Sequence, residues 1–210
     1  YKSKRELADD AIYLERELCN EAGGVQDQIA VAFGGFNRID FSADGYQVTP
    51  VVMSNERKEI LNDNLMMFFT GFSRFSSDIQ TSTQAVLKDK TAQLLEMYSL
   101  VDTAQGILTD KNSDLNDFGR LLDHTWKLKR GITTRISTNS LDEIYEKAMS
   151  AGALGGKLLG AGGGGFFVFY VEPEKRKSVM QALDKLLYIP FKFEDSGTRV
   201  IYFDAEDYQI

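Results

Sequence analysis

The chain has 210 residues, 43% of them apolar and 26% charged, which is typical of a soluble globular protein with one large or two small domains. Its net charge of −7 excludes a nucleic-acid or membrane-surface binder that works by bulk positive charge. No apolar run approaches the roughly 18 residues of a membrane span. The single cysteine and single histidine exclude an internal disulfide and a histidine-rich metal site, so we expect a cytoplasmic protein with neither nucleic acid nor membrane as a partner.

The first third of the chain reads as two helices, a hairpin and a buried strand. Apolar residues at a spacing near 3.6 predict a long first helix, which Gly23 and Gly24 would end. Asp44 and Gly45 form a typical hairpin turn. The expected elements are helices over residues 5–22 and 29–33 and strands over residues 37–41, 47–53 and 64–70.

The remainder alternates helical patterns with short strands. Helical spacing dominates residues 72–108, Thr138 is placed to cap a later helix, and Pro173 opens another. This order predicts the α+β class, with helices on one face of a mostly antiparallel sheet. The further expected elements are helices over residues 115–128, 141–151 and 174–187 and strands over residues 166–171, 189–193 and 199–203.

A charged stretch at residues 56–62 is the expected domain boundary. We therefore predict one domain over residues 1–58, which reads as the end of a larger domain, and a second over residues 59–210. The chain begins close to a helix and without an initiator methionine, which leads us to expect a longer protein upstream.

The most informative stretch is a glycine loop between a predicted helix and a predicted strand. It contains Gly160 and the four consecutive glycines Gly162, Gly163, Gly164 and Gly165. The order helix, loop, strand is the reverse of a P-loop, and no Gly-Lys-Ser/Thr follows. Two interpretations stay open: bare amides that approach an anion beside Lys157, or a tight crossover where two backbones touch.

Asp27 follows a glycine pair and precedes a short apolar helix. One interpretation is an ordinary helix cap, because Asp is a preferred residue at that position. The other is a functional carboxylate, which the helix dipole would keep ionised.

Two further groups are candidates for binding an anion. Ser73 and Arg74 follow Thr70 at a strand-to-helix corner, where hydroxyls and a guanidinium suit a phosphate or a sugar hydroxyl. Lys127, Lys129, Arg130 and Arg135 form a basic cluster in an acidic chain. Each group also has a plain interpretation, a helix cap for the first and a solvated helix end for the second.

Two of these segments together resemble the GHMP superfamily of small-molecule kinases. Residues 24–28, Gly-Val-Gln-Asp-Gln, are similar to its Gly-x-x-Asp-Gln segment, and residues 157–166 are similar to its C-terminal glycine motif. Within the superfamily the chain resembles bacterial D-glycero-D-manno-heptose 7-phosphate kinases, through residues 33–37, 69–74 and 124–129. The likeness covers nearly the whole chain and implies a ferredoxin-like C-terminal α/β sandwich.

The resemblance also implies a reaction and a set of roles. An ATP-dependent kinase, with Mg²⁺ bound along with ATP, would phosphorylate the anomeric hydroxyl of a sugar phosphate. Asp27 would take or orient the proton of that hydroxyl. The glycine loop would line the site of transfer. The residues implied to contact the substrate are Gly24, Gln26, Gln28, Ser73, Arg74, Lys129 and Arg130.

The serine- and glycine-rich loop that holds the ATP phosphates in this family has no counterpart in the sequence. We therefore expect this chain alone to be inactive. Two other functions stay open: a galactokinase- or fucokinase-like enzyme for a neutral sugar, and a non-catalytic α+β module for ligand binding or dimerisation. The sequence also leaves open whether the protein is a homodimer.

Overall fold

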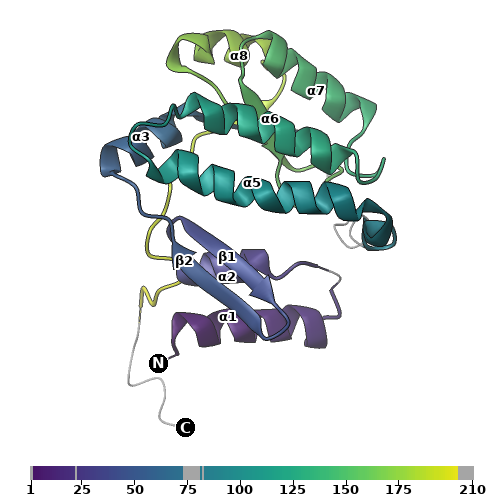
Figure 1. Ribbon diagram of the computed structural model, residues 1–210. Helices are drawn as coiled ribbons and strands as arrows, with labels where there is room; N and C mark the ends of the chain where they lie inside the picture. Colours follow the sequence, from purple (N-terminus) through teal and green to yellow (C-terminus); the bar gives the residue numbers. More distant parts are fainter. Residues whose placement is uncertain (1, 22, 73–80, 82, 203–210) are drawn as a thin grey trace. The chain divides into compact units, whose positions relative to one another are not determined.

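The computed structural model describes residues 2–21, 23–72, 81 and 83–202 (Figure 1). Two compact units divide the chain, the first formed by Tyr1–Pro50 with Phe193–Ile210 and the second by Val51–Lys192. Each unit is described by itself. The expected kinase-domain boundary between residues 58 and 59 stays a prediction.

The first unit begins with helix α1, Lys4–Tyr13. Ser3 and Glu6 cap its start reciprocally, because the Ser3 hydroxyl accepts from the Glu6 amide and the Glu6 carboxylate accepts from the Ser3 amide. The helix continues as a π-helical turn, Leu14–Leu18, and is shorter than expected. Asn20 then adopts a positive φ of 55°, so the chain leaves the helix before it reaches the glycine pair.

Helix α2, Gln26–Phe33, is followed by the antiparallel hairpin of strands β1, Asn37–Ser42, and β2, Gly45–Pro50. The predicted hairpin is confirmed, and Gly45 has the positive φ, 124°, that its turn demands. A small core joins these elements. It consists of the buried Ala8, Ile29 and Ala32 and the partly buried Leu7, Ile12, Val25, Phe33, Ile39, Tyr46 and Val48.

The segment after residue 192 packs on the end of α2. A Cβ on Gly34 would lie 2.0 Å from the Gly197 nitrogen, so both positions exclude a side chain. The Gly35 amide donates to the Glu194 carbonyl and the Thr198 amide donates to the Val31 carbonyl, at 2.8 and 2.9 Å. The expected strand over residues 199–203 is therefore wrong for residues 199–202, since this segment forms loop contacts instead.

The second unit contains most of the secondary structure. The first helix is α3, Asn55–Asn64, and strand β3, Leu65–Phe69, follows it directly. A 3-10 turn, Leu87–Lys90, leads into the long helix α5. The elements from there on are α5 Thr91–Thr109, α6 Asn116–Arg130, α7 Asn139–Ser150, β4 Gly155–Leu158, β5 Phe166–Tyr170, the 3-10 turn Pro173–Lys175, α8 Arg176–Ala182 and β6 Leu187–Ile189.

The four strands of this unit form one antiparallel sheet in the order β4-β5-β3-β6. This unit has the ferredoxin-like topology, in which the chain runs strand, helices, strand, strand, helix, strand. The predicted α+β class and sandwich are therefore confirmed. Thr138 caps α7 as expected, through its hydroxyl and the Leu141 amide. Strand β4 was not predicted, and β6 overlaps the strand expected over residues 189–193 only at Ile189.

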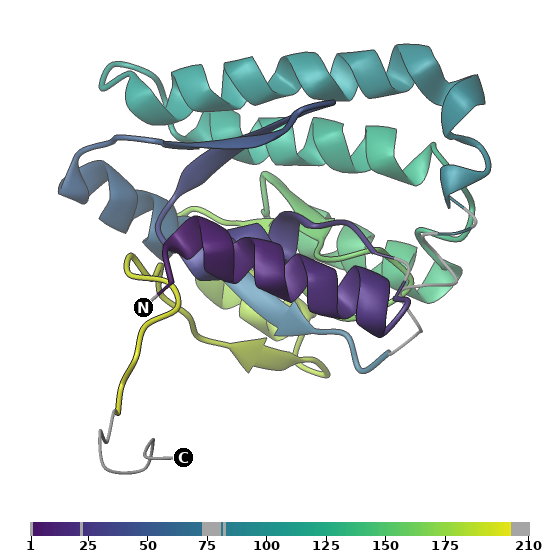
Figure 2. The same ribbon diagram turned by 90° about the horizontal axis from the view of Figure 1, so that it is seen from below.

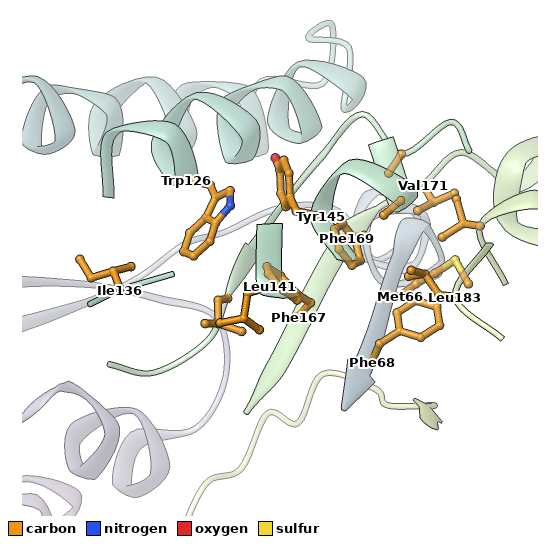
Figure 3. Close-up of a cluster of buried hydrophobic side chains, with 14 of the residues drawn as sticks. Met66, Phe68, Trp126, Ile136, Leu141, Tyr145, Phe167, Phe169, Val171 and Leu183 are labelled. Atoms are coloured by element: carbon orange, nitrogen blue, oxygen red, sulfur yellow. The ribbon is translucent and has the colours of Figure 1, made fainter. Parts of the chain in front are cut away.

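The core of the second unit is aromatic (Figure 3). Trp126 of α6 meets Phe167 of β5 edge to face, with ring centroids 5.7 Å apart, and Phe167 stacks on Phe169 at 5.2 Å. Tyr145 of α7 lies against both phenylalanines. The fully buried members also include Phe68, Met66, Ile136, Leu141, Leu158, Val171 and Val179. Burial of this apolar surface stabilises the sheet against α6, α7 and α8.

Helix α6 reaches both the helical layer and the sheet. It lies side by side with α5 in both views (Figures 1 and 2). It also crosses β4, where a Cβ on Gly155 would lie 1.9 Å from the Gly119 carbonyl oxygen. This contact of backbone on backbone requires glycine at Gly155. No helix among the described residues is both long and apolar enough to cross a lipid bilayer.

We predict that Gly155→Ala lowers the free energy of unfolding by roughly 2–4 kcal/mol, because the added methyl group meets a backbone oxygen that cannot rotate away. Gly106→Ala in α5 is the matched control, since no described atom lies within 4 Å of its added Cβ. The control should gain about 0.5–1 kcal/mol. Urea unfolding measures both changes, and equal effects at the two positions would contradict the proposed packing of α6 on β4.

Candidate active site

The glycine loop, residues 159–165, joins β4 to β5 and is held by backbone contacts. The Gly163 amide donates to the Ile136 carbonyl and the Gly165 amide to the Phe72 carbonyl, both at 2.9 Å. A Cβ on Gly164 would lie 2.4 Å from the Phe72 oxygen. The crossover interpretation therefore accounts for part of the glycine run, because backbones do touch here.

The remaining amides of the loop are unused. Among the described residues, no hydrogen bond is donated by the N–H of Gly160, Ala161, Gly162 or Gly164. Gly160 has a positive φ of 73°, and a Cβ there would meet no described atom within 4 Å. The loop also has positive φ at Gly162, Gly163 and Gly165. Unused backbone amides in a glycine loop are suited to an anion, so the anion interpretation stays a prediction for the positions that the backbone contacts do not explain.

Thr70 anchors the far side of the loop. Its amide and its hydroxyl both donate to the Gly165 carbonyl at 2.9 Å, and the hydroxyl accepts from the Phe72 amide at 3.3 Å. Thr70 is one of two buried polar residues among those described. Its hydroxyl is thus fully occupied in holding the loop. The predicted Ser73 and Arg74 follow directly in the chain and lie outside the described residues.

Two lysines lie beside the loop without a carboxylate. Lys129, near the end of α6, donates from Nζ to the Gly160 carbonyl at 2.7 Å. Burial, and then the nearby charge of Lys157, lower the pKa of Lys129 to about 8. Burial also lowers the pKa of Lys157. Neither amine forms an ion pair within the part of the chain that the structure describes.

The other cations of the predicted basic cluster differ from this pair. Arg130 forms an ion pair with Asp142 of α7 at 2.7 Å, and Asp142 also accepts from the Ser137 hydroxyl. Lys127 is exposed and pairs with Asp123 at 2.6 Å. These two side chains already have carboxylate partners, and the expected contact of Arg130 with a substrate stays a prediction.

Asp27 belongs to the first unit and lies in the first turn of α2, one position inside the helix. The residue at the cap is Val25, which makes no side-chain cap, so the interpretation of Asp27 as the cap is wrong. The carboxylate is exposed and accepts only a 3.4 Å contact from Gln26 Nε2 among the described residues. An exposed carboxylate that the fold does not use is available for a ligand.

Gln28 connects the start of α2 to the π-helical turn. Its Nε2 donates to the carboxylate of Glu15. Its Oε1 is buried and has no hydrogen-bond partner among the described residues. A buried acceptor without a partner is unfavourable, so this amide has spare capacity beside Asp27. Gly24, which precedes them, has no described atom within 4 Å of an added Cβ.

These features suit a phosphate-bearing ligand. Unused loop amides and two cations provide donors for phosphate oxygens. No group of three His, Cys, Asp or Glu side chains gathers in the described part of the chain to hold a metal ion. A magnesium ion that is held mostly by nucleotide phosphates and water would be compatible with such a chain.

Comparisons with known proteins identify the class. Residues 104–189 match the family model described as GHMP kinases C terminal. A D-glycero-alpha-D-manno-heptose 7-phosphate kinase of Campylobacter jejuni is 32% identical over 182 residues, which are 86% of this chain and 53% of that protein. The chain thus spans about half the length of this relative. Residues 104–189 of this chain thus carry the C-terminal domain of the GHMP kinases.

Solved structures agree with this assignment. A crystal structure of a putative sugar kinase from Campylobacter jejuni has a TM-score of 0.64 and 27% identity, covering 93% of this chain and 56% of that one. A D-glycero-D-manno-heptose 1-phosphate kinase from Bacteroides thetaiotaomicron has a TM-score of 0.60 and 27% identity, covering 93% and 54%. The fold is that of the GHMP kinases.

Sequence reasoning missed the contacts that distinguish the cations. It grouped Lys129 with Arg130, although Asp142 neutralises only the arginine. It placed Lys157 beside the loop but not beside Lys129, which lies on a different element. The alternation of side chains along β4 was one signal that Lys157 lies on the side of α6. Lys157 shares a face of the strand with Gly155, where α6 crosses.

The lowered pKa of Lys129 makes stability depend on pH. Below about pH 8 the amine is charged in both states, and the penalty for burying it is fully present. Between about pH 8 and 10.5 the folded state releases the proton that the unfolded state keeps, so stability rises with pH. Burial shifts the pKa of Lys157 in the same direction.

We predict that Lys129→Met is more stable than the parent at about pH 7 and that the gap shrinks by roughly 2 kcal/mol at about pH 10. Urea unfolding at both pH values measures the gap. A gap that does not change with pH would show that the amine is not buried as described.

Proposed function

We propose that the chain is the C-terminal part of an ATP-dependent kinase that phosphorylates the anomeric hydroxyl of a sugar phosphate, D-glycero-D-manno-heptose 7-phosphate. The observation that carries the proposal is the combination of a heptose 7-phosphate kinase-like sequence over 86% of the chain with loop amides that have no acceptor among the described residues and a lysine that holds the loop. A site of cations and free amides suits an acceptor that already bears a phosphate.

In this proposal the residues of the chain position and polarise the substrates, and they form no covalent bond with them. ATP supplies the phosphoryl group and Mg²⁺ neutralises its developing charge. Asp27 accepts or orients the proton of the anomeric hydroxyl, which requires an accessible carboxylate; among the described residues it accepts only the long contact from Gln26. Gln26 and Gln28 flank it, and the spare acceptor of Gln28 suits a sugar hydroxyl. The amides of Gly160, Gly162 and Gly164 donate to phosphate oxygens.

The position of the phosphate already on the sugar is the finer question. One relative is named a heptose 7-phosphate kinase, whereas one similar structure is named a heptose 1-phosphate kinase. We favour the 7-phosphate because that relative shares 32% of its aligned residues with this chain. The complete protein should be assayed for ATP turnover with both heptose phosphates and with galactose. Turnover of galactose alone would support the neutral-sugar kinase, and turnover of none would favour the binding module.

We predict that Asp27→Asn in the full-length enzyme lowers kcat by at least about 10²-fold, the lower end for loss of an acid–base group. Asp44→Asn is the matched control, because it makes the same charge change in the hairpin turn and Asn-Gly is an equally good turn. Steady-state kinetics with heptose 7-phosphate measures both. A kcat near that of the parent for Asp27→Asn would exclude Asp27 as the acid–base residue.

A further inference from the structure

Lys129 and Lys157 are an unusual pair in an acidic chain. They come from α6 and β4, and both side chains are partly buried. The chain has 31 acidic residues against 24 basic ones, so carboxylates are plentiful. Their neighbours Lys127 and Arg130 each form an ion pair with a carboxylate. Neither Lys129 nor Lys157 forms such a pair within the described residues.

Such a pair is unfavourable in the absence of a ligand. Each partly buried ammonium loses hydration, and the two positive charges repel one another. Lys129 recovers one hydrogen bond, to the Gly160 carbonyl, while none is donated by Lys157 to the residues that the structure describes. A protein retains an arrangement of this kind where a bound anion offsets the repulsion.

The anion has donors beside the lysines. The carbonyl that Lys129 holds belongs to the first glycine of the loop, and the amides of Ala161 and Gly162 follow it unused in the described structure. Lys157 lies three residues before that glycine in the preceding strand. We propose that Lys129 and Lys157, together with the free amides of the glycine loop, form a binding site for a phosphate group.

The chemistry selects a phosphate dianion over a carboxylate. Two ammonium groups carry two charges, and a phosphate monoester offers up to two negative charges and three acceptor oxygens that can bridge both amines and a backbone amide. The phosphate could belong to the acceptor sugar or to the nucleotide. The assignment to the acceptor rests on the proposed function, whereas phosphate binding by the pair does not.

The first experiment measures binding of inorganic phosphate to the full-length protein by calorimetry at low ionic strength. We expect Lys157→Met to weaken binding by about 10-fold or more, the effect of one lost charge-assisted hydrogen bond. Lys127→Met is the control, since it removes the same charge from an exposed, paired position, and it should change affinity less than about 2-fold. The melting temperature of Lys157→Met should stay the same or rise, because a repulsive buried charge is removed.

Equal phosphate affinity for Lys157→Met and the parent would overturn the proposal. If Lys157→Met does not fold, an NMR titration of the parent protein tests the proposed phosphate site instead. Bound phosphate should raise the pKa values of Lys129 and Lys157, which lysine ¹³Cε NMR shifts measure. No change in those titrations on saturation with phosphate would overturn it equally.

Kinetics then distinguish the source of the phosphate. A rise in KM for the sugar phosphate alone in Lys157→Met assigns the site to the acceptor, and a rise in KM for ATP alone assigns it to the nucleotide. Should the enzyme phosphorylate no sugar while phosphate binding still depends on Lys157, the binding site stands and the proposed function fails.

Discussion

The candidate site depends on direct contact between backbones at the glycine loop. Gly164 approaches the Phe72 carbonyl so closely that no side chain could fit, and Gly163 and Gly165 donate to carbonyls of two other segments. The loop is thereby fixed to the end of β3 and to the turn after α6. Those glycines donate their amides to the protein, whereas the amides of their neighbours have no acceptor in the described part of the chain. One packing constraint thus produces both the rigidity of the loop and its free donors.

The same close packing explains the electrostatics. Gly155 allows α6 to lie directly on β4, and this brings the end of α6, with Lys129, to the loop that begins beyond Lys157. A larger residue at Gly155 would move the helix away, and the amine of Lys129 would regain contact with water. The lowered pKa of Lys129 is therefore a consequence of a helix–strand contact made ten residues earlier in α6, at Gly119.

Local signals made much of the fold predictable. The Asp44-Gly45 hairpin, the Thr138 cap and the apolar run of β3 each depend on neighbours in sequence, and each formed as expected. The failures depend on distant contacts. Residues 199–202 have a strand-like sequence, but the segment before them is bound to α2 through Gly34 and Gly197. Strand β4 contains two glycines and lacks a strand pattern, because packing by α6 and β5 selects its composition.

The candidate site shows the same division. The glycine motif and Asp27 were visible as residue types in a pattern, but their structural roles were not. Asp27 is not a helix cap, since the cap of α2 is Val25, two residues earlier than the spacing suggested. Arg130 and Lys129 are adjacent and chemically similar. The position of Asp142 on α7 gives Arg130 a carboxylate, whereas Lys129 has none among the described residues. No single-sequence pattern encodes that difference, because it is set by the packing of α7 against α6.

The burial of the two lysines and the exposure of Asp27 suggest how specificity and catalysis would separate in a kinase of this class. A phosphate held by Lys129 and Lys157 is bound equally in the ground state and the transition state, so its loss should be felt mainly in KM. In the proposed reaction Asp27 would act on the hydroxyl that changes charge during transfer, so its loss should be felt in kcat. Two half-buried amines and one exposed carboxylate are physically suited to these separate tasks: burial strengthens the anchoring interaction, whereas exposure leaves the carboxylate free to meet a substrate.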